Sequence, residues 1–262
     1  MATPQPTDDE ILAQLAAIRE EECASLPLIS SPISVVDFTE KIRSSGAPTS
    51  FIVKLESLPK ESKIRRIRPD GNCFYRAYAC GILQIIKDHG QQTLPDNTTL
   101  SARFRTLVSK EGLQCCEAAG YPKFTVEDFM EAFLEEIDKL DDTGTTAAGE
   151  ISSDNDAYIV TFLRCLSSSV LKLHREEYAP FLSPEYPTID QYCATEVDPM
   201  YREADQLPIV ALSRFLQFPV EIVYIDQSPE TTPAKHTFPP TNPLNLPTVR
   251  LLYRPGHYDL LV

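Results

Sequence analysis

Apolar residues recur at helical spacing through most of the first 220 positions. Five stretches place apolar side chains three or four residues apart, which predicts helices that bury one face. The first stretch is apolar on nearly every side, so we expect it to be a buried central helix. The five stretches are residues 74–87, 100–116, 125–140 (with an N-cap at Thr125), 158–173 and 207–218.

Toward the C-terminus the pattern becomes typical of strands. Residues 220–225, 249–253 and 258–262 are rich in β-branched and aromatic side chains and are predicted to form strands. Residues 227–247 hold six prolines and show no period, so we expect a long loop. Residues 141–156 are rich in Thr, Gly, Ser and Asp and are predicted to form a surface loop. Together these patterns predict an α+β fold, helix-rich with a small central sheet.

The N-terminal region has a pattern of its own. Thr7 and Glu10 form a capping box, and apolar residues follow at helical spacing to Ile18, which predicts a short amphipathic helix. Residues 24–62 contain several prolines and are expected to be irregular with one or two short helices. We therefore predict two parts, an N-terminal arm at residues 1–60 and a main domain at residues 61–262.

Composition and charge narrow the class of protein. The chain has 262 residues and a net charge of −14, which disfavours binding to nucleic acid phosphates and anionic membranes. This charge either favours a basic partner or simply keeps the protein in solution. No stretch is long and apolar enough for a membrane span, and the acidic N-terminus does not resemble a secretion signal. The seven cysteines form no CxxC pair, so reduced thiols are expected, in the cytoplasm and also the nucleus. The four histidines do not pair with cysteines at ligand spacing, and we expect no metal and no cofactor.

One cysteine lies where a nucleophile could form. Pro69 and Gly71 predict a tight turn, and Cys73 follows at the start of the helix predicted at residues 74–87. Unpaired backbone N–H groups and the helix dipole favour a thiolate at such a position, and the thiolate is the reactive form. Backbone N–H groups of the turn could bind an oxyanion, with Asp70 shaping the loop through its side chain.

The last strand supplies a matching base. His257 and Asp259 are two residues apart, so in a strand their side chains share one face and the carboxylate can orient the imidazole. Gly256 allows close approach of a substrate before the histidine. Taken singly, a cysteine such as Cys73 is usually a small buried hydrophobe, His257 an exposed strand histidine and Asp259 an edge-strand charge. Taken together, they predict a cysteine hydrolase.

The two motifs resemble those of the ovarian-tumour (OTU) class of deubiquitinases, in particular its otubain branch, peptidase C65. The resemblance covers roughly residues 60–262. It is carried by the cysteine motif Pro69-Asp70-Gly71-Asn72-Cys73-Phe74-Tyr75-Arg76-Ala77, the histidine motif Leu251-Leu252-Tyr253-Arg254-Pro255-Gly256-His257-Tyr258-Asp259, and the intervening segments Phe124–Phe129, Glu196–Met200 and Val220–Tyr224.

This resemblance implies a papain-like fold and a thiol protease that cleaves isopeptide bonds between ubiquitin units. It makes Cys73 the nucleophile, His257 the general base and acid, Asp259 the residue that orients His257, and Asp70 a support of the active-site loop. Gly71, Asn72 and Gly256 are the expected substrate contacts. The implied partners are ubiquitin, polyubiquitin chains and ubiquitin-conjugating enzymes, with a preference for the chain linkage associated with degradation.

Two other functions stay open at this point. The protein could regulate the ubiquitin pathway by restraining ubiquitin-conjugating enzymes without catalysis, or it could act on another ubiquitin-like modifier. Candidate ubiquitin-binding surfaces are the helix at residues 128–140 and the acidic segment 196–205. The N-terminal helix either takes part in a second ubiquitin site, as the resemblance implies, or packs on its own domain.

Overall fold

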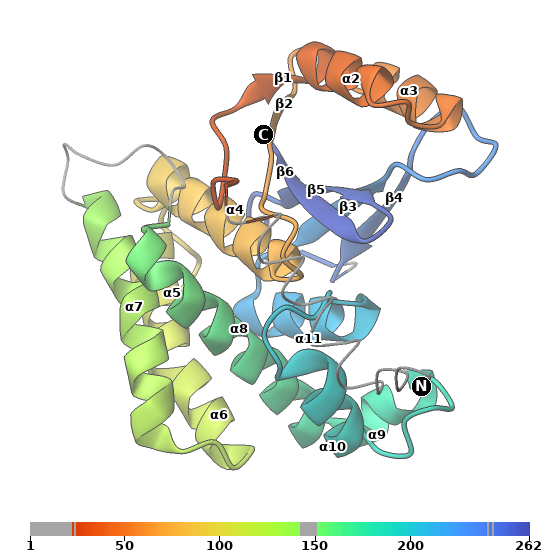
Figure 1. Ribbon diagram of the computed structural model, residues 1–262. Helices are drawn as coiled ribbons and strands as arrows, with labels where there is room; N and C mark the ends of the chain where they lie inside the picture. Colours follow the sequence, from red (N-terminus) through yellow and green to blue (C-terminus); the bar gives the residue numbers. More distant parts are fainter. Residues whose placement is uncertain (1–22, 24, 142–150, 240, 243) are drawn as a thin grey trace, which may run out of the picture.

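Six strands form one mixed sheet in the computed structural model, which describes residues 23, 25–141, 151–239, 241–242 and 244–262 (Figure 1). β3 and β5 run parallel to each other, and every other neighbouring pair is antiparallel. In spatial order the strands are β1 (Ile33–Ser34), β2 (Lys63–Arg65), β6 (His257–Leu261), β5 (Val249–Arg254), β3 (Val220–Tyr224) and β4 (Ala234–Phe238).

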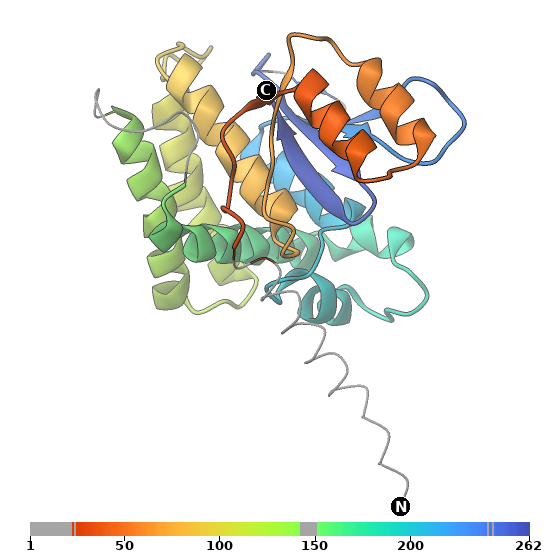
Figure 2. The same ribbon diagram turned by 45° about the horizontal axis from the view of Figure 1, so that its top comes forward.

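Helices cover both faces of this sheet. α2 (Val35–Ser44) and α3 (Thr49–Glu56) pack on one face, while α4 (Cys73–His89) lies against β5 and β6 on the other face (Figures 1 and 2). The α-helices are α2 (Val35–Ser44), α3 (Thr49–Glu56), α4 (Cys73–His89), α5 (Leu100–Thr106), α6 (Leu113–Ala118), α7 (Lys123–Asp141), α8 (Ser153–Leu173), α9 (Arg175–Tyr178), α10 (Ile189–Tyr192) and α11 (Gln206–Leu216). Two π-helical turns, Leu107–Gly112 and Cys193–Val197, and a 3₁₀ turn, Ala179–Phe181, complete the helical segments of the described residues.

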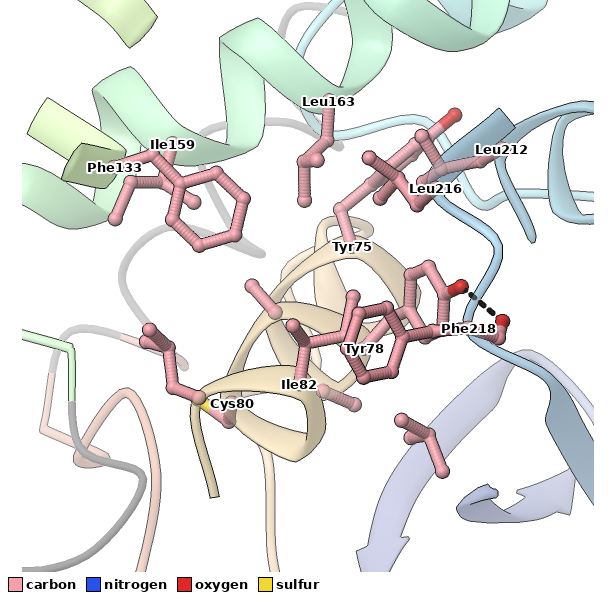
Figure 3. Packing of buried hydrophobic residues seen from close by; sticks show 14 of the residues in the cluster. Tyr75, Tyr78, Cys80, Ile82, Phe133, Ile159, Leu163, Leu212, Leu216 and Phe218 are labelled. Carbon is pink, nitrogen blue, oxygen red and sulfur yellow. Dashed lines mark hydrogen bonds between the residues drawn. The ribbon is translucent and has the colours of Figure 1, made fainter. Parts of the chain in front are cut away.

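The main core surrounds α4, as its continuous apolar pattern predicts. From Cys73 to Leu83 every residue of this helix is buried, because α4 is enclosed by the sheet, α7 and α8. Tyr78 donates a hydrogen bond to the carbonyl of Phe218, which satisfies its hydroxyl inside the core (Figure 3). Desolvation raises the pKa of Tyr78 well above its ordinary value, so this hydroxyl stays protonated.

The side chains on the two faces of β6 pack into different hydrophobic clusters. Tyr258 and Leu260 pack into the core around α4, whereas Leu261 packs into the smaller core beneath α2 and α3. His257 and Asp259 share the parity of Leu261, so the predicted common face of these two residues is confirmed. Tyr258 points the other way and meets the ring of Phe74 edge-on.

Most of the predicted elements are present, and the main corrections concern their limits. The long helix predicted for residues 100–116 is interrupted by the π-helical turn. α7 begins at Lys123, so Thr125 lies inside the helix and is not its N-cap. α8 begins five residues earlier than predicted, at Ser153. β4 lies within the segment that was predicted to be a loop throughout.

The segment before residue 60 joins the same sheet. It supplies β1, which pairs with β2, and the two short helices α2 and α3, as predicted. The amphipathic helix predicted near Thr7–Ile18 lies outside the described residues, as does much of the predicted loop at 141–156. The division of the chain after residue 60 stays a prediction. In the described part of the chain, no helix is long and apolar enough to cross a membrane.

Candidate active site

The turn before α4 places Cys73 at the first position of the helix, as predicted. Gly71 adopts φ +86°, a left-handed conformation that favours glycine. A Cβ at this position would stand 2.2 Å from the carbonyl oxygen of Tyr201, so a side chain is excluded on steric grounds as well. The glycine therefore lets the turn pack tightly against the segment around Tyr201.

Asp70 holds this turn from inside. Its Oδ1 accepts a hydrogen bond from the N–H of Asn72 at 2.9 Å, which is the local bond expected of an aspartate in a turn. Both carboxylate oxygens also receive the guanidinium of Arg76, at 3.0 and 2.8 Å. Arg76 in turn binds Asp156 of α8 through two hydrogen bonds of 2.6 and 2.8 Å. These contacts direct the Asp70 carboxylate toward the loop and Arg76, in agreement with a supporting role.

His257 and Asp259 are joined directly. The Nε2 atom of His257 lies 2.8 Å from Oδ1 of Asp259. That carboxylate is fully buried and also accepts hydrogen bonds from the N–H of Ile67 and from Arg254 Nη2, both at 2.9 Å. Burial acts to raise the pKa of Asp259, but the His257 hydrogen bond and charge, Arg254 and Ile67 outweigh it and hold that pKa below its ordinary value. Asp259 is therefore a fixed negative charge behind the imidazole.

The imidazole of His257 also interacts with the side chain of Cys73. Burial acts to lower the pKa of His257, but the hydrogen bond with Asp259 and the interaction with the Cys73 side chain raise it to about 9. Nδ1 itself has no partner within hydrogen-bond geometry among the described residues. The thiol of Cys73 thus acts on the imidazole without closing a full hydrogen bond, a looseness that is common in active sites without substrate.

Two N–H groups of the turn are available for an oxyanion. Those of Asp70 and Asn72 already donate within the loop, to Arg68 O and to the Asp70 carboxylate. Those of Gly71 and Cys73 make no hydrogen bond to another described residue. Because Gly71 has no side chain and Cys73 begins α4, both groups can meet a carbonyl oxygen held over the thiol.

The three predicted substrate contacts differ in their exposure. Gly256 is exposed, with φ +79°, and a Cβ there would stand 3.7 Å from an oxygen of Glu203. Gly71 is half-buried, and Asn72 is 1% exposed with its side chain turned inward. Substrate contact stays a prediction for all three residues, and the structure gives the Asn72 side chain a structural task.

Comparisons with known proteins identify the family of this chain. The profile of the family "Peptidase C65 Otubain" matches residues 21–262. The chain belongs to the otubain family. Ubiquitin thioesterase OTUB1 of Homo sapiens is 32% identical over 260 residues, which cover 97% of this chain and 90% of the human protein. Ubiquitin thioesterase otubain-like of Caenorhabditis elegans is 34% identical over 264 residues, which cover 97% and 89%.

The fold of this otubain also matches solved structures over nearly its whole length. An OTUB1 chain in a complex described as h/ceOTUB1–ubiquitin aldehyde–UBC13~Ub superposes with a TM-score of 0.81 and 30% identity, covering 97% of this chain and 98% of that chain. A related complex that contains UBCH5B~Ub gives a TM-score of 0.80 with 97% of each chain covered. The predicted α+β papain-like OTU fold is therefore confirmed.

Several residues of the otubain site were not foreseen from the sequence. Arg76 and Arg254 lie inside the two motifs, but nothing in their spacing shows that each clamps a carboxylate of the site. Asp156, which completes the Arg76 cluster, lies eighty residues from it in the chain. Arg254 also places its guanidinium over the ring of Phe38 in α2, so the N-terminal helices contact the orienting side of the site.

Proposed function

We propose that this otubain is a cysteine deubiquitinase that hydrolyses the isopeptide bond between ubiquitin units. The observation that supports this most directly is that His257 bonds a buried carboxylate and also interacts with the side chain of Cys73 at the start of α4. The names of the relatives, ubiquitin thioesterases of animals and an OTU-domain deubiquitinating enzyme of Arabidopsis thaliana, supply the substrate class.

The reaction begins with Cys73. Its thiolate attacks the isopeptide carbonyl while His257 retains the proton, and the N–H groups of Gly71 and Cys73 stabilise the negative charge on the carbonyl oxygen. His257 then gives this proton to the departing lysine amine, which leaves a thioester between Cys73 and the C-terminus of ubiquitin. Water attacks the thioester and passes one proton to His257. The C–S bond then breaks, which returns the Cys73 thiolate, and ubiquitin leaves as a carboxylic acid that loses its proton to the solvent. Asp259 keeps the imidazole in the required orientation throughout.

A panel of ubiquitin dimers that covers every linkage tests this proposal. The wild-type protein is expected to cleave at least one linkage, and Cys73→Ala is expected to abolish cleavage while ubiquitin binding remains measurable. Cys115→Ala serves as the control, because this thiol lies on α6 and burial raises its pKa to about 11. Absence of cleavage across the whole panel contradicts the proposal.

The same panel tests a finer proposal on linkage. We infer from the otubain resemblance that the enzyme prefers the linkage associated with proteasomal degradation. Cleavage of that dimer is expected to exceed cleavage of the other dimers by about tenfold or more, equivalent to about 1.4 kcal/mol of differential transition-state binding. Equal rates across the linkages reject this preference and leave the deubiquitinase assignment intact.

A second candidate function rests on the solved complexes. Two OTUB1 chains that superpose on this protein over 97% of its length were solved with ubiquitin-charged conjugating enzymes. We propose that this chain also binds such enzymes and slows ubiquitin transfer without cleavage. Cys73→Ala is expected to retain this inhibition, and deletion of residues 1–22 to weaken it. Unchanged inhibition by the deletion variant assigns the N-terminal segment a structural role instead.

A further inference from the structure

A buried arginine of α8 binds the turn that carries the nucleophile. Arg164 is 1% exposed. Its Nη2 atom donates to the carbonyl of Gly71 at 3.1 Å and to Oδ1 of Asn72 at 2.8 Å. These two acceptors immediately precede Cys73 in the chain, so the guanidinium fixes the backbone from which the thiol and the oxyanion donors project.

The same guanidinium holds a second segment against the turn. Nη1 donates to Val197 O at 3.0 Å, and Nη2 donates to Arg202 O at 2.6 Å. Asn72 strengthens this bridge, because its Oδ1 also accepts from the N–H of Tyr201 at 3.0 Å. Residues 197–202 and the nucleophile turn are thus joined through one buried side chain, with Gly71 packed against the carbonyl of Tyr201.

The electrostatic setting of Arg164 differs from that of its neighbour Arg76. Arg76 forms ion pairs with Asp70 and Asp156, whereas Arg164 lies within ion-pair distance of no described carboxylate. Its bonded acceptors are neutral oxygens, its Nε makes no hydrogen bond to a described residue, and its Cζ lies over the Tyr75 ring, 4.4 Å from the ring centroid. Arg76, Arg164, Asp70 and Asp156 together carry no net charge. Because both aspartates pair with Arg76, the positive charge of Arg164 lies beside the loop without a carboxylate partner among the described residues.

Burial of such a charge is costly. Desolvation lowers the pKa of Arg164, and electrostatic interactions with Tyr75, Asp70 and Cys73 oppose that effect. An apolar side chain of similar volume is often as stable as a buried ion or more stable, so stability alone is a weak reason for an arginine here. The position of the charge beneath the nucleophile provides a better one.

We propose that Arg164 is a positioning residue for Cys73. It locks the Gly71–Cys73 turn to residues 197–202 and holds a positive charge beneath the loop that stabilises the thiolate. Its role in ubiquitin cleavage rests on the function proposed above, whereas its effect on the thiol does not. The titratable groups around Arg164 are Tyr75, Asp70, Cys73 and Arg76, and those acting on Cys73 also include His257 and Tyr258.

Two variants and a small reagent test the proposal. The rate of iodoacetamide alkylation of the Cys73 peptide is followed by mass spectrometry at pH 7, and kcat and KM are measured on a ubiquitin dimer. Arg164→Met is expected to slow alkylation of Cys73 by about tenfold, because the thiolate loses the nearby positive charge. Arg164→Lys keeps the charge and loses the bridge, so its alkylation rate is expected to stay near wild type while kcat falls about tenfold or more at similar KM.

Phe162→Leu is the matched control. Phe162 lies on α8 and packs against Phe133, so the substitution removes core contacts from the same helix without touching the loop. It is expected to lower the unfolding temperature and to leave the alkylation rate unchanged. If Arg164→Met folds and its Cys73 is alkylated as in the wild type, the proposal is overturned. If Arg164→Met does not fold, a wild-type kcat in Arg164→Lys overturns it. If wild type cleaves no ubiquitin dimer, the proposed function fails, and alkylation still decides the role of Arg164.

Discussion

At the scale of single residues, the protonation of His257 determines what the site can do. Burial lowers the pKa of this imidazole, and the interactions with Asp259 and Cys73 raise it to about 9. The protonated ring is therefore the dominant form at neutral pH, ready to deliver a proton to a leaving amine. Above about pH 9 the ring loses this proton, so activity should decline there.

Asp259→Asn tests this assignment through the pH profile. Asparagine keeps the shape of the side chain but removes the charge, so burial becomes the dominant influence and lowers the pKa of His257. The alkaline limb of kcat/KM, expected near pH 9 in the wild type, should move down by at least one unit, with a loss of about 10²-fold or more at pH 8. Glu221→Gln removes a carboxylate from β3 that pairs with Arg250 and should leave the limb in place. An unmoved limb in Asp259→Asn means that Asp259 does not set the charge of His257.

The sequence allows Cys73, His257 and Asp259 to be predicted because each depends on local rules. A turn followed by a helix start and a strand with period two can both be read within a few residues. The partners that stabilise them cannot be read in this way. Arg164 of α8 bonds the nucleophile turn from ninety-two residues along the chain, and Asp156 of the same helix binds Arg76, eighty residues from it. No periodicity links such positions, since their proximity follows from how α8 packs behind α4.

At the scale of elements, the turn before α4 is defined by what packs against it. Two constraints apply to Gly71. It adopts a left-handed φ, and a Cβ on it would collide with the carbonyl oxygen of Tyr201. Gly120 has a similar φ of +94° after α6, and a Cβ there would meet nothing within 4 Å. The two glycines therefore separate the cost of backbone strain from the cost of a steric clash.

Gly71→Ala and Gly120→Ala form a matched pair for this turn. Each is expected to lose about 1–2 kcal/mol of unfolding free energy from the left-handed conformation. Gly71→Ala should lose more, because the turn or residues 197–202 must move, and its kcat should fall by about 10²-fold as Cys73 is displaced. Urea unfolding and ubiquitin-dimer cleavage measure the two effects. Equal stability losses with full activity in both variants show that the contact with Tyr201 is not required.

The elements that the sequence did not predict share a physical cause. β4 reads Ala-Lys-His-Thr-Phe, with four exposed positions, because it is an edge strand whose order comes from pairing with β3. Without a buried face it has no apolar alternation. The start of α8 is likewise polar, and its Asp156 is buried against Arg76, so an apolar pattern places the helix start too late. Tertiary contacts define these boundaries.

At the scale of the whole molecule, the site joins distant parts of the chain. α4 packs against β6, which brings the thiol of Cys73 to the imidazole of His257, and β2 lies beside β6, so that Ile67 just beyond it can bind Asp259. Since α2 and α3 cover the face of the sheet that carries His257 and Asp259, the orienting carboxylate is closed off from water. The contacts of the site therefore exist only in the folded sheet, so the stability of the fold should depend on the protonation of the site.

The pH dependence of stability follows from the signs of two pKa shifts. The pKa of His257 is raised from 6.5 to about 9 by folding, so its contribution is complete below pH 6.5 and is lost as pH rises through about 9. The pKa of Asp259 is lowered, so its contribution is present above the ordinary value of 3.8 and is lost on further acidification. Stability should therefore be greatest between about pH 5 and 6.5 as far as these two groups are concerned.

Urea unfolding between pH 6 and 8.5 measures the His257 part of this dependence. The folded state keeps a proton that the unfolded state loses, so the unfolding free energy of wild type should fall by up to about 1.4 kcal/mol per pH unit. His257→Gln removes the proton and should flatten the curve. Buried thiols such as Cys116, whose pKa is raised to about 12, add a further decline only near and above pH 9, so the range stays below it. A wild-type curve as flat as that of His257→Gln means that folding does not bind this proton, and the charged imidazole is then not part of the folded site.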